Sequence, residues 1–198
     1  EPTKFVSKKD FIDINDKTFK LVNDSNIFKS TIQYTNKLGI IFSSNNGFPI
    51  YFIESNFKED EYSLEISKDK IQIFHKNYGG KFYGIVTLIQ LIDFYGNKLP
   101  ICKIDDKPKY PWRGMHLDCA RQFYTIGEIK RILDYMALFK INRFHWHLTD
   151  NEAWRIEIKS FPNLTKFGSY RGYNMTIPPF YGSGYEKYGG YYSHDDIK

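Results

Sequence analysis

Cysteine is scarce in this sequence: only Cys102 and Cys119 occur among 198 residues. Two cysteines are too few for a disulfide framework, and their separation fits no zinc motif. We interpret both as buried free thiols, although a disulfide between them stays open if the compartment is oxidising. Long apolar runs are also missing, and no stretch approaches the roughly 18 residues of a membrane-spanning helix. We therefore expect no membrane span.

Clusters of basic residues are missing as well, although the formal net charge is +5 and the isoelectric point is about 9.0. The lysines and arginines are scattered along the chain, whereas nucleic-acid binding proteins usually gather them on one face or in a known motif. We expect a solvated, lysine-rich surface and no nucleic-acid partner. Hydrophobic residues make up 41% of the chain and aromatic residues 18%, which is enough for a packed core and excludes global disorder.

The first half of the chain alternates between apolar and polar residues in the manner of strands. From residue 31 to about 76 the pattern is strand-like, and "EYSLEIS" with "KIQIFHK" predicts a hairpin over 61–67 and 70–76. Apolar residues then recur at three and four over 81–94, which predicts a packed helix. Further short strands are predicted at 39–44, 49–55 and 99–104. We expect a non-catalytic α+β domain over 1–107, with a charged, proline-containing linker at 105–111.

The second half, 108–198, has a different pattern. An apolar strand at 114–120 and another at 141–148 flank a predicted helix. Thr125 and Glu128 form a capping box that opens this helix, whose core stripe is Ile129, Ile132, Leu133, Met136 and Phe139. Strand, helix and strand at this spacing predict a βαβ unit with parallel strands. A further helix start is expected after 192–196.

The fold class expected for the whole chain is α/β: an α+β domain followed by the first βα units of a (β/α)8 barrel. A complete barrel needs about 250 residues, more than this half supplies. We therefore expect a truncated piece of a larger protein. The start at Glu1-Pro2 predicts removal of an upstream segment, by signal-peptide cleavage or an engineered cut.

Charged residues follow both predicted parallel strands. Asp118 and Arg121 lie at the end of the first strand, and Asp150 lies at the end of the second. Chemistry in parallel α/β folds collects at the carboxyl ends of strands, so these residues are expected on one rim. The guanidinium fork of arginine suits vicinal hydroxyls or carboxylates. A purely structural Arg121–Asp150 salt bridge is the alternative at this point.

The same second strand carries two histidines. His145 and His147 are two residues apart, so both side chains are expected on one side of the strand. Such a pair can bind a catalytic metal, which would make the protein a metal-dependent hydrolase. The other histidines, His75, His116 and His194, form no metal-binding pair in the sequence. Trp146 between the two suits packing or the floor of a sugar site. We expect no metal and no cofactor.

The segment that begins "PWRGMHLDCARQFY" and continues through "INRFHWHLTDNEAWRIEIKSFPNLTKFGSYRG" resembles the opening of the catalytic barrel of family 20 β-N-acetylhexosaminidases. The shared features are an Arg-Gly before the first strand, Leu-Asp-x-x-Arg-x-Phe at its end, and His-x-His-Leu-Thr-Asp on the second strand. "GGKFYGIVTLIQLI" and "LPICKIDDKPKYPWRG" resemble the end of the non-catalytic domain of that family. The likeness runs from about residue 60 to 198 and is most specific over 111–172.

The resemblance implies an enzyme, an exo-β-N-acetylhexosaminidase that removes terminal β-linked N-acetylglucosamine or N-acetylgalactosamine with retention. In this family the 2-acetamido oxygen of the substrate acts as the nucleophile, which makes it an exception to the two-carboxylate scheme. Arg121 matches the arginine that holds the 3- and 4-hydroxyls of the sugar. Asp150 matches a catalytic aspartate that bonds a later histidine next to the acid glutamate. Asp118 and His147 match supporting positions.

The sequence departs from the family pattern in the loop after the second strand, where "Asp-Asp-Gln-Gly-Trp-Arg" is replaced by "DNEAWR" at 150–155. The Asp-Glu pair that the family uses for acid–base catalysis does not occur, so we expect this piece alone to be inactive. A catalytically dead carbohydrate-binding relative is the other interpretation. The expected partner is an amino-sugar glycoside, with a homodimer possible at full length. The expected location is secreted, periplasmic or lysosome-like, where the sequons at Asn23, Asn163 and Asn174 would matter.

Overall fold

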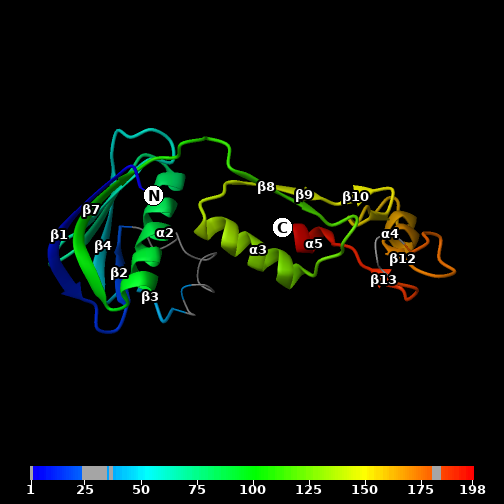
Figure 1. The fold of residues 1–198 in the computed structure, drawn as a ribbon, viewed down its shortest axis with the longest axis horizontal. Helices are drawn as coiled ribbons and strands as arrows, with labels where there is room; N and C mark the ends of the chain where they lie inside the picture. Colours follow the sequence, from blue (N-terminus) through cyan, green and yellow to red (C-terminus); the bar gives the residue numbers. More distant parts are fainter. Residues whose placement is uncertain (1, 24–34, 36–37, 180–183) are drawn as a thin grey trace. The chain divides into compact units, whose positions relative to one another are not determined.

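The computed structural model describes residues 2–23, 35, 38–179 and 184–198 of the chain. The chain divides into two compact units, Glu1–Pro111 and Trp112–Lys198. They run from blue to green and from green to red in Figure 1. In the part of the chain that the structure describes, no helix is both long and apolar enough to cross a membrane.

A seven-stranded mixed sheet forms the body of the first unit, with strand order β1-β7-β5-β6-β4-β2-β3. The pairs from β1 through β7 and β5 to β6 are antiparallel, and the pairs from β6 through β4 and β2 to β3 are parallel. The strand bounds are β1 Lys4–Asp13, β2 Thr18–Val22, β3 Ile41–Ser43, β4 Phe48–Glu54, β5 Tyr62–Ile66, β6 Ile71–His75 and β7 Lys98–Asp106.

One helix, α2 (Tyr78–Tyr95), packs against β5, β6 and β7 (Figure 1). It begins where the Asn77 side chain accepts a hydrogen bond from the Gly80 N–H at 3.0 Å, a standard N-cap. Gly84 lets the helix approach the sheet closely, because a Cβ at this position would lie 2.6 Å from a methyl carbon of Ile73. The packed helix, together with the alternate residues of β5 and β6, gives this unit a continuous apolar core.

The predicted hairpin is confirmed, with Tyr62 opposite His75 and Ile66 opposite Ile71. The predicted strands at 39–44, 49–55 and 99–104 and the helix at 81–94 are also confirmed within a few residues. The strand-like interpretation of the start at 31 is wrong at Thr35, whose backbone is helical, while 31–34 and 36–37 lie outside the described residues. β7 continues to Asp106, so the first two residues of the predicted linker belong to a strand.

The second unit is built on a parallel pair, β8 (Gly114–Asp118) and β9 (Arg143–His147), joined by α3 (Ile126–Leu138). This confirms the predicted βαβ unit. The capping box is also confirmed: the Thr125 Oγ1 accepts from the Glu128 N–H, and the Glu128 carboxylate accepts from the Thr125 N–H. The remaining elements are β10 Thr149–Asp150, β11 Ala153–Trp154, α4 Asn163–Gly168, β12 Tyr170–Arg171, β13 Tyr188–Gly189 and α5 His194–Ile197.

The predicted core stripe of α3 is only partly correct. Ile129 and Met136 are buried, but Leu133 is 41% exposed and Phe139 is 69% exposed. The reason is that the packed cluster against this helix comes mainly from β8, β9 and the segment around Tyr192, which covers only part of an apolar stripe of this width.

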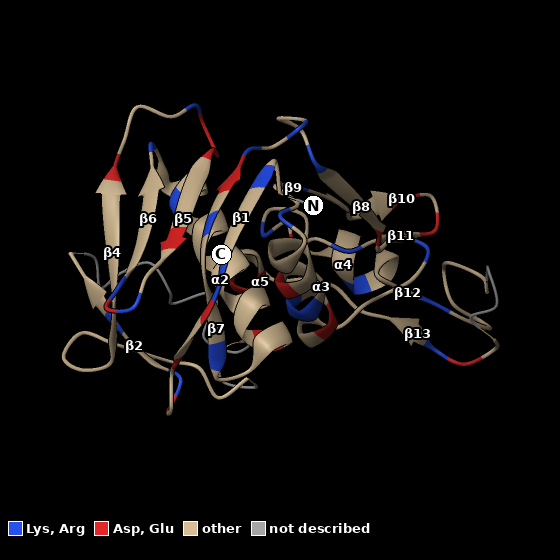
Figure 2. Cartoon of the chain, turned by 60° about the vertical axis from the view of Figure 1, so that its left-hand side comes forward, with Lys and Arg blue, Asp and Glu red and all other residues tan. Residues whose placement is uncertain are grey.

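Charged side chains of both signs are interspersed over strands, helices and loops (Figure 2). The scattered basic residues seen in the sequence therefore do not gather on one element. This distribution fits an ordinary solvated surface.

Candidate active site

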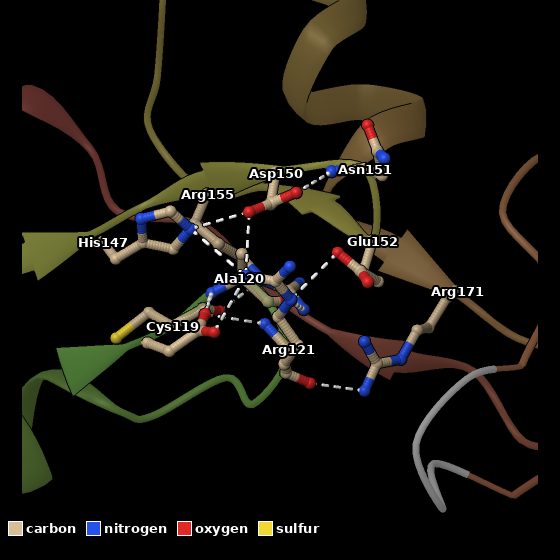
Figure 3. Close-up of polar contacts among 10 residues, drawn as sticks. Cys119, Ala120, Arg121, His147, Asp150, Asn151, Glu152, Arg155 and Arg171 are labelled. Carbon is tan, nitrogen blue, oxygen red and sulfur yellow. Dashed lines mark hydrogen bonds and ion pairs between the residues drawn. The ribbon is translucent and has the colours of Figure 1, made fainter.

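A polar rim forms where β8 and β9 end, and it consists of Asp118, Arg121, His147, Asp150 and Glu152. The parallel register places Asp118 beside His147, so the segments that follow both strands start from the same edge. Arg121 and Asp150 meet there, with 2.8 Å between Arg121 Nη1 and Asp150 Oδ2 (Figure 3). The structure thus brings the four residues singled out in the sequence into one cluster.

Asp118 shapes the turn that carries Arg121. Its Oδ1 accepts hydrogen bonds from the backbone N–H groups of Ala120 at 3.0 Å and Arg121 at 3.1 Å. Its Oδ2 accepts from the Arg121 guanidinium at 3.0 Å. The carboxylate therefore fixes both the backbone and the side chain of Arg121, which fits a supporting role.

His147 connects the rim to β9. Its Nε2 lies 3.0 Å from Asp150 Oδ2 and 3.4 Å from Arg121 Nη1. Asp150 also accepts from the Asn151 backbone N–H at 2.8 Å. The aspartate is thus shared between a cation and an imidazole, as a carboxylate with four lone-pair sites can be.

Glu152 is a rim residue that the sequence did not single out. The residue is buried, with an exposed fraction of 9%. Its Oε2 lies 3.1 Å from Arg121 Nε. The pair is within ion-pair distance, but this buried oxygen has no hydrogen-bond partner among the described residues. The signal that could have found it is the spacing: Glu152 lies two residues after Asp150, in the turn between β10 and β11.

The electrostatics favour the charged forms of Asp118, Arg121 and Asp150. Burial raises the pKa of the Asp118 carboxyl, but the backbone and guanidinium hydrogen bonds of Arg121 outweigh it and hold that pKa below its ordinary value. The Asn151 N–H, followed by His147, lowers the pKa of Asp150. For Arg121, burial opposes the charge, yet the carboxylates led by Asp118 raise its pKa.

Two buried arginines hold the backbone beneath the rim. Arg155 is fully buried and donates to the carbonyls of Cys119 at 3.0 Å and Ala120 at 3.2 Å. Arg171 is 1% exposed and donates to the carbonyl of Arg121 at 2.5 Å (Figure 3). Three successive carbonyls are therefore held by two guanidinium groups. Burial, followed by repulsion from Arg171, lowers the pKa of Arg155.

These arginines were missed as positioning residues, since an arginine in an apolar stretch is usually assumed to reach solvent. Arg155 appears in the sequence only as part of the family motif "WRIEI". Its positive charge lies over the Phe123 ring at 5.5 Å, and that of Arg171 lies over the Tyr188 ring at 5.1 Å. Aromatic neighbours thus replace the carboxylates expected beside a buried cation.

Arg121 keeps donors available for a ligand. Its side chain is 37% exposed, and its Nη2 has no partner among the residues that the structure describes. All the rim contacts use Nη1 or Nε. Because a guanidinium offers five N–H donors in a fixed fork, the outward edge can hold two oxygens of a ligand.

Trp146 does not face the rim. Its indole N–H points to Cys119 Sγ at 3.1 Å, and its ring packs on Tyr192 with 4.5 Å between centroids. Of the two interpretations open from the sequence, packing is confirmed. Cys119 is buried and free, as is Cys102, in agreement with the expected free thiols.

The histidines of β9 lie on the opposite side of the strand from Trp146, as the two-residue spacing predicted. The interpretation that the other histidines stand in no metal-binding pair does not hold for His116. His116 on β8 is paired with His145 in the parallel register, and the ligand-capable atoms of His116, His145 and His147 all lie within 4.8 Å of one another.

The sequence matches two models of a single family. Residues 110–198 match glycosyl hydrolase family 20, catalytic domain, and residues 13–107 match glycosyl hydrolase family 20, domain 2. The chain belongs to glycosyl hydrolase family 20. The family assignment covers both units, so it includes the polar rim and the sheet of the first unit.

Similar family 20 proteins carry hexosaminidase names. The chain is 41% identical over 142 residues to a beta-hexosaminidase from Vibrio furnissii, covering 71% of this chain and 23% of that protein. It is 39% identical over 150 residues to a beta-hexosaminidase from Porphyromonas gingivalis, covering 71% and 18%. The crystal structure of an exo beta-N-acetylglucosaminidase from Vibrio harveyi, in complex with N-acetylglucosamine, has a TM-score of 0.87 and 32% identity, covering 100% and 32%. The chain thus spans less than a third of these family 20 relatives.

Proposed function

We propose that this chain is part of an exo-β-N-acetylhexosaminidase that hydrolyses terminal β-linked N-acetylglucosamine or N-acetylgalactosamine. The observation that carries the proposal is the Arg121–Asp150 contact of 2.8 Å at the rim of a family 20 chain. The relatives described above, whose names include beta-hexosaminidase, provide the substrate class. We further propose that the second unit supplies the first βα units of a (β/α)8 barrel, and that neighbouring units cover the exposed side of α3.

The charge of the rim favours a neutral, hydroxyl-rich ligand over an anion. Asp118, Asp150 and Glu152 surround one guanidinium, that of Arg121. With the imidazole neutral, the cluster has a net formal charge of −2, which repels a carboxylate or phosphate ligand. Sugar hydroxyls can accept from the free edge of Arg121 and donate to the carboxylates, so both signs of the rim are used.

In the proposed retaining mechanism the carbonyl oxygen of the 2-acetamido group attacks the anomeric carbon. The glycosidic C–O bond breaks as a carboxylic acid from another part of the protein protonates the leaving oxygen. Water then opens the oxazolinium ring and delivers its proton to the same carboxylate, which restores the acid. The substrate supplies the nucleophile, so no second carboxylate at bonding distance is required.

The residues of this chain act by holding the sugar and by orienting a proton relay. Arg121 binds the 3- and 4-hydroxyls, and Asp118 keeps its guanidinium in place. Asp150 bonds a later histidine of the full-length protein, and that histidine contacts the acid. This relay maintains the acid in the protonation state that each step needs. His147 holds Asp150 from the strand side at 3.0 Å.

The proposal is tested by release of p-nitrophenol from its β-N-acetylglucosaminide, using the full-length protein that contains this chain. Activity is expected, with retention of anomeric configuration by NMR, and the β-glucoside that lacks the acetamido group should not be cleaved. Arg121→Lys should raise KM more than it lowers kcat, because one fork-shaped contact is replaced by a point charge. Arg131→Lys on the exposed surface of α3 is the matched control.

Two results would contradict the proposal. Absence of hydrolysis by a folded full-length protein that still binds N-acetylglucosamine would indicate a carbohydrate-binding relative. Loss of the activity on treatment with a chelator would favour the metal-dependent hydrolase instead.

A further inference from the structure

We propose that Glu152 is a positioning residue for sugar binding, because it fixes the orientation of the Arg121 guanidinium that holds the 3- and 4-hydroxyls. This role rests on the proposed function, since it concerns the same rim and the same ligand. Glu152 acts through Arg121 and does not itself contact the sugar. The contact between the two residues joins two segments of this chain, so it does not depend on any surface being exposed.

The turn between β10 and β11 directs Glu152 inward. Asp150 pairs with Ala153 across the two strands, so only two residues connect them. Of these two, Asn151 is exposed, whereas Glu152 is buried. Ala153, directly after the turn, is 2% exposed and anchors it in the second unit. Since the length of a hairpin turn fixes the register of its strands, the backbone determines which of the two side chains faces the rim.

The burial of Glu152 requires a compensating charge. Glutamate is almost never buried unless it is paired, because removing a carboxylate from water is costly. Among the described residues this charge is the guanidinium of Arg121, whose Nε lies 3.1 Å from the Oε2 of Glu152. The pairing therefore explains why the carboxylate can lie inside the turn.

The other two carboxylates of the rim hold Arg121 at a different atom. Asp118 Oδ2 lies 3.0 Å from Nη1, and Asp150 Oδ2 lies 2.8 Å from the same nitrogen. Contacts with one nitrogen leave a flexible side chain able to turn its planar group about that point. Glu152 contacts Nε instead (Figure 3). Because the guanidinium is planar and rigid, holding Nη1 and Nε together fixes the direction of the third nitrogen, Nη2.

The orientation of the guanidinium matters for a ligand that it grips with two donors. A fork-shaped pair of donors must lie in line with both acceptor oxygens, and a misplacement of about 1 Å can cost roughly 100-fold. A contact that holds Arg121 before and after binding acts by preorganisation, so it strengthens binding of the substrate and of the transition state alike. Loss of Glu152 should therefore raise KM and leave kcat nearly unchanged.

The test compares hydrolysis of p-nitrophenyl β-N-acetylglucosaminide by the full-length wild type and by Glu152→Gln, which keeps the size of the side chain and removes its charge. KM is expected to rise about tenfold, with kcat changed by less than about twofold. Glu152→Ala should raise KM further. In an Arg121→Lys background, Glu152→Gln should add little, because the effects of residues that share one contact are not additive.

Glu59→Gln is the matched control, because it removes an exposed glutamate of the first unit and should change neither KM nor kcat. Tryptophan fluorescence checks that each variant is folded. Hydrolysis by the wild type tests the proposed function separately from the role of Glu152. If the wild type binds N-acetylglucosamine without cleaving it, calorimetry on the same variants should show the same tenfold loss, now in Kd.

Four results would overturn the positioning role. The first is a KM, or a Kd, that is unchanged in both Glu152→Gln and Glu152→Ala. The second is a full tenfold effect of Glu152→Gln in the Arg121→Lys background, which would show that the two residues act independently. The third is a lower kcat with an unchanged KM, which would place Glu152 in the chemical step. A wild type that neither cleaves nor binds the sugar would overturn the proposed function together with this role.

Discussion

Replacing Arg155 with leucine should destabilise the second unit strongly. The guanidinium donates to the carbonyls of Cys119 at 3.0 Å, Ala120 at 3.2 Å and Gly190 at 3.1 Å, and also to that of Ser169. Leucine leaves these four buried acceptors without the donor. The leucine side chain has nearly the same apolar volume as the aliphatic part of the arginine side chain. The substitution therefore tests the hydrogen bonds more than the packing.

The magnitude follows from two opposing effects. Hydrogen bonds to a charged group contribute about 1.5–3 kcal/mol each, so four of them would give a large loss. However, the buried guanidinium of Arg155 has no carboxylate partner among the described residues. Removing this buried charge also removes its desolvation penalty, which is on the order of several kcal/mol. We expect a net loss of about 3–5 kcal/mol, against a typical domain stability of about 5–15 kcal/mol.

Urea unfolding followed by tryptophan fluorescence measures this loss specifically. All three tryptophans, Trp112, Trp146 and Trp154, lie in the second unit, so the signal reports on that unit alone. With a slope of about 1–3 kcal/mol/M, the midpoint should fall by roughly 2 M. Arg131→Leu, on the exposed surface of α3, should shift stability by only about 0.5 kcal/mol. A loss below about 1 kcal/mol for Arg155→Leu would refute the argument, as would full rescue by Arg155→Lys, which lacks the fork.

Three further predictions concern acid, thiol chemistry and backbone strain. The pKa of Asp118 in the folded protein lies below its ordinary 3.8. Its contribution to the free energy of unfolding is therefore present above about pH 4 and is lost as the pH falls through the folded pKa. Asp118→Asn should therefore weaken the acid dependence of unfolding, and an unchanged pH profile would contradict this. Burial raises the pKa of the Cys102 thiol to about 11, and that of Cys119 is also raised. A thiol reagent at pH 8 should modify neither until urea is added. Gly189→Ala should lower the free energy of unfolding by at least about 1–3 kcal/mol, because φ is +137° and the new Cβ would clash with the Ser169 carbonyl oxygen. An unchanged melting temperature would disprove this strain.

Local patterns predicted most elements of this chain because they are encoded by neighbouring residues. The alternation in 61–67 and 70–76 gave the β5–β6 hairpin, and the Thr125–Glu128 box gave the start of α3. β1 and β2 gave no such signal. β1 is almost entirely exposed, so its sequence "KFVSKKDFID" shows no buried alternate face, and its place is set by pairing with β7, which is remote in sequence.

The rim was predictable in part because strand ends obey a topological rule, whereas the supporting arginines do not. Asp118, Arg121 and Asp150 follow directly from placing two parallel strands side by side. Arg155 and Arg171 can support the rim only if the chain returns to it after α4, because the carbonyls that they bind are those of residues 119–121 and 190. No periodicity in the sequence specifies that return.

The histidine cluster could not be predicted from the sequence because the register of β8 against β9 was not known. The face of His145 and His147 follows from a two-residue spacing alone, but adding His116 requires the register of β8 against β9. A shift of one residue would place Met115 or Leu117 beside His145 and turn the third imidazole toward α3. The register is fixed from the other face, where Leu117, Phe144 and Trp146 pack against the buried cluster. Apolar packing on one side of the pair therefore determines which polar atoms meet on the other, and the meeting of the three histidines is a consequence of the core.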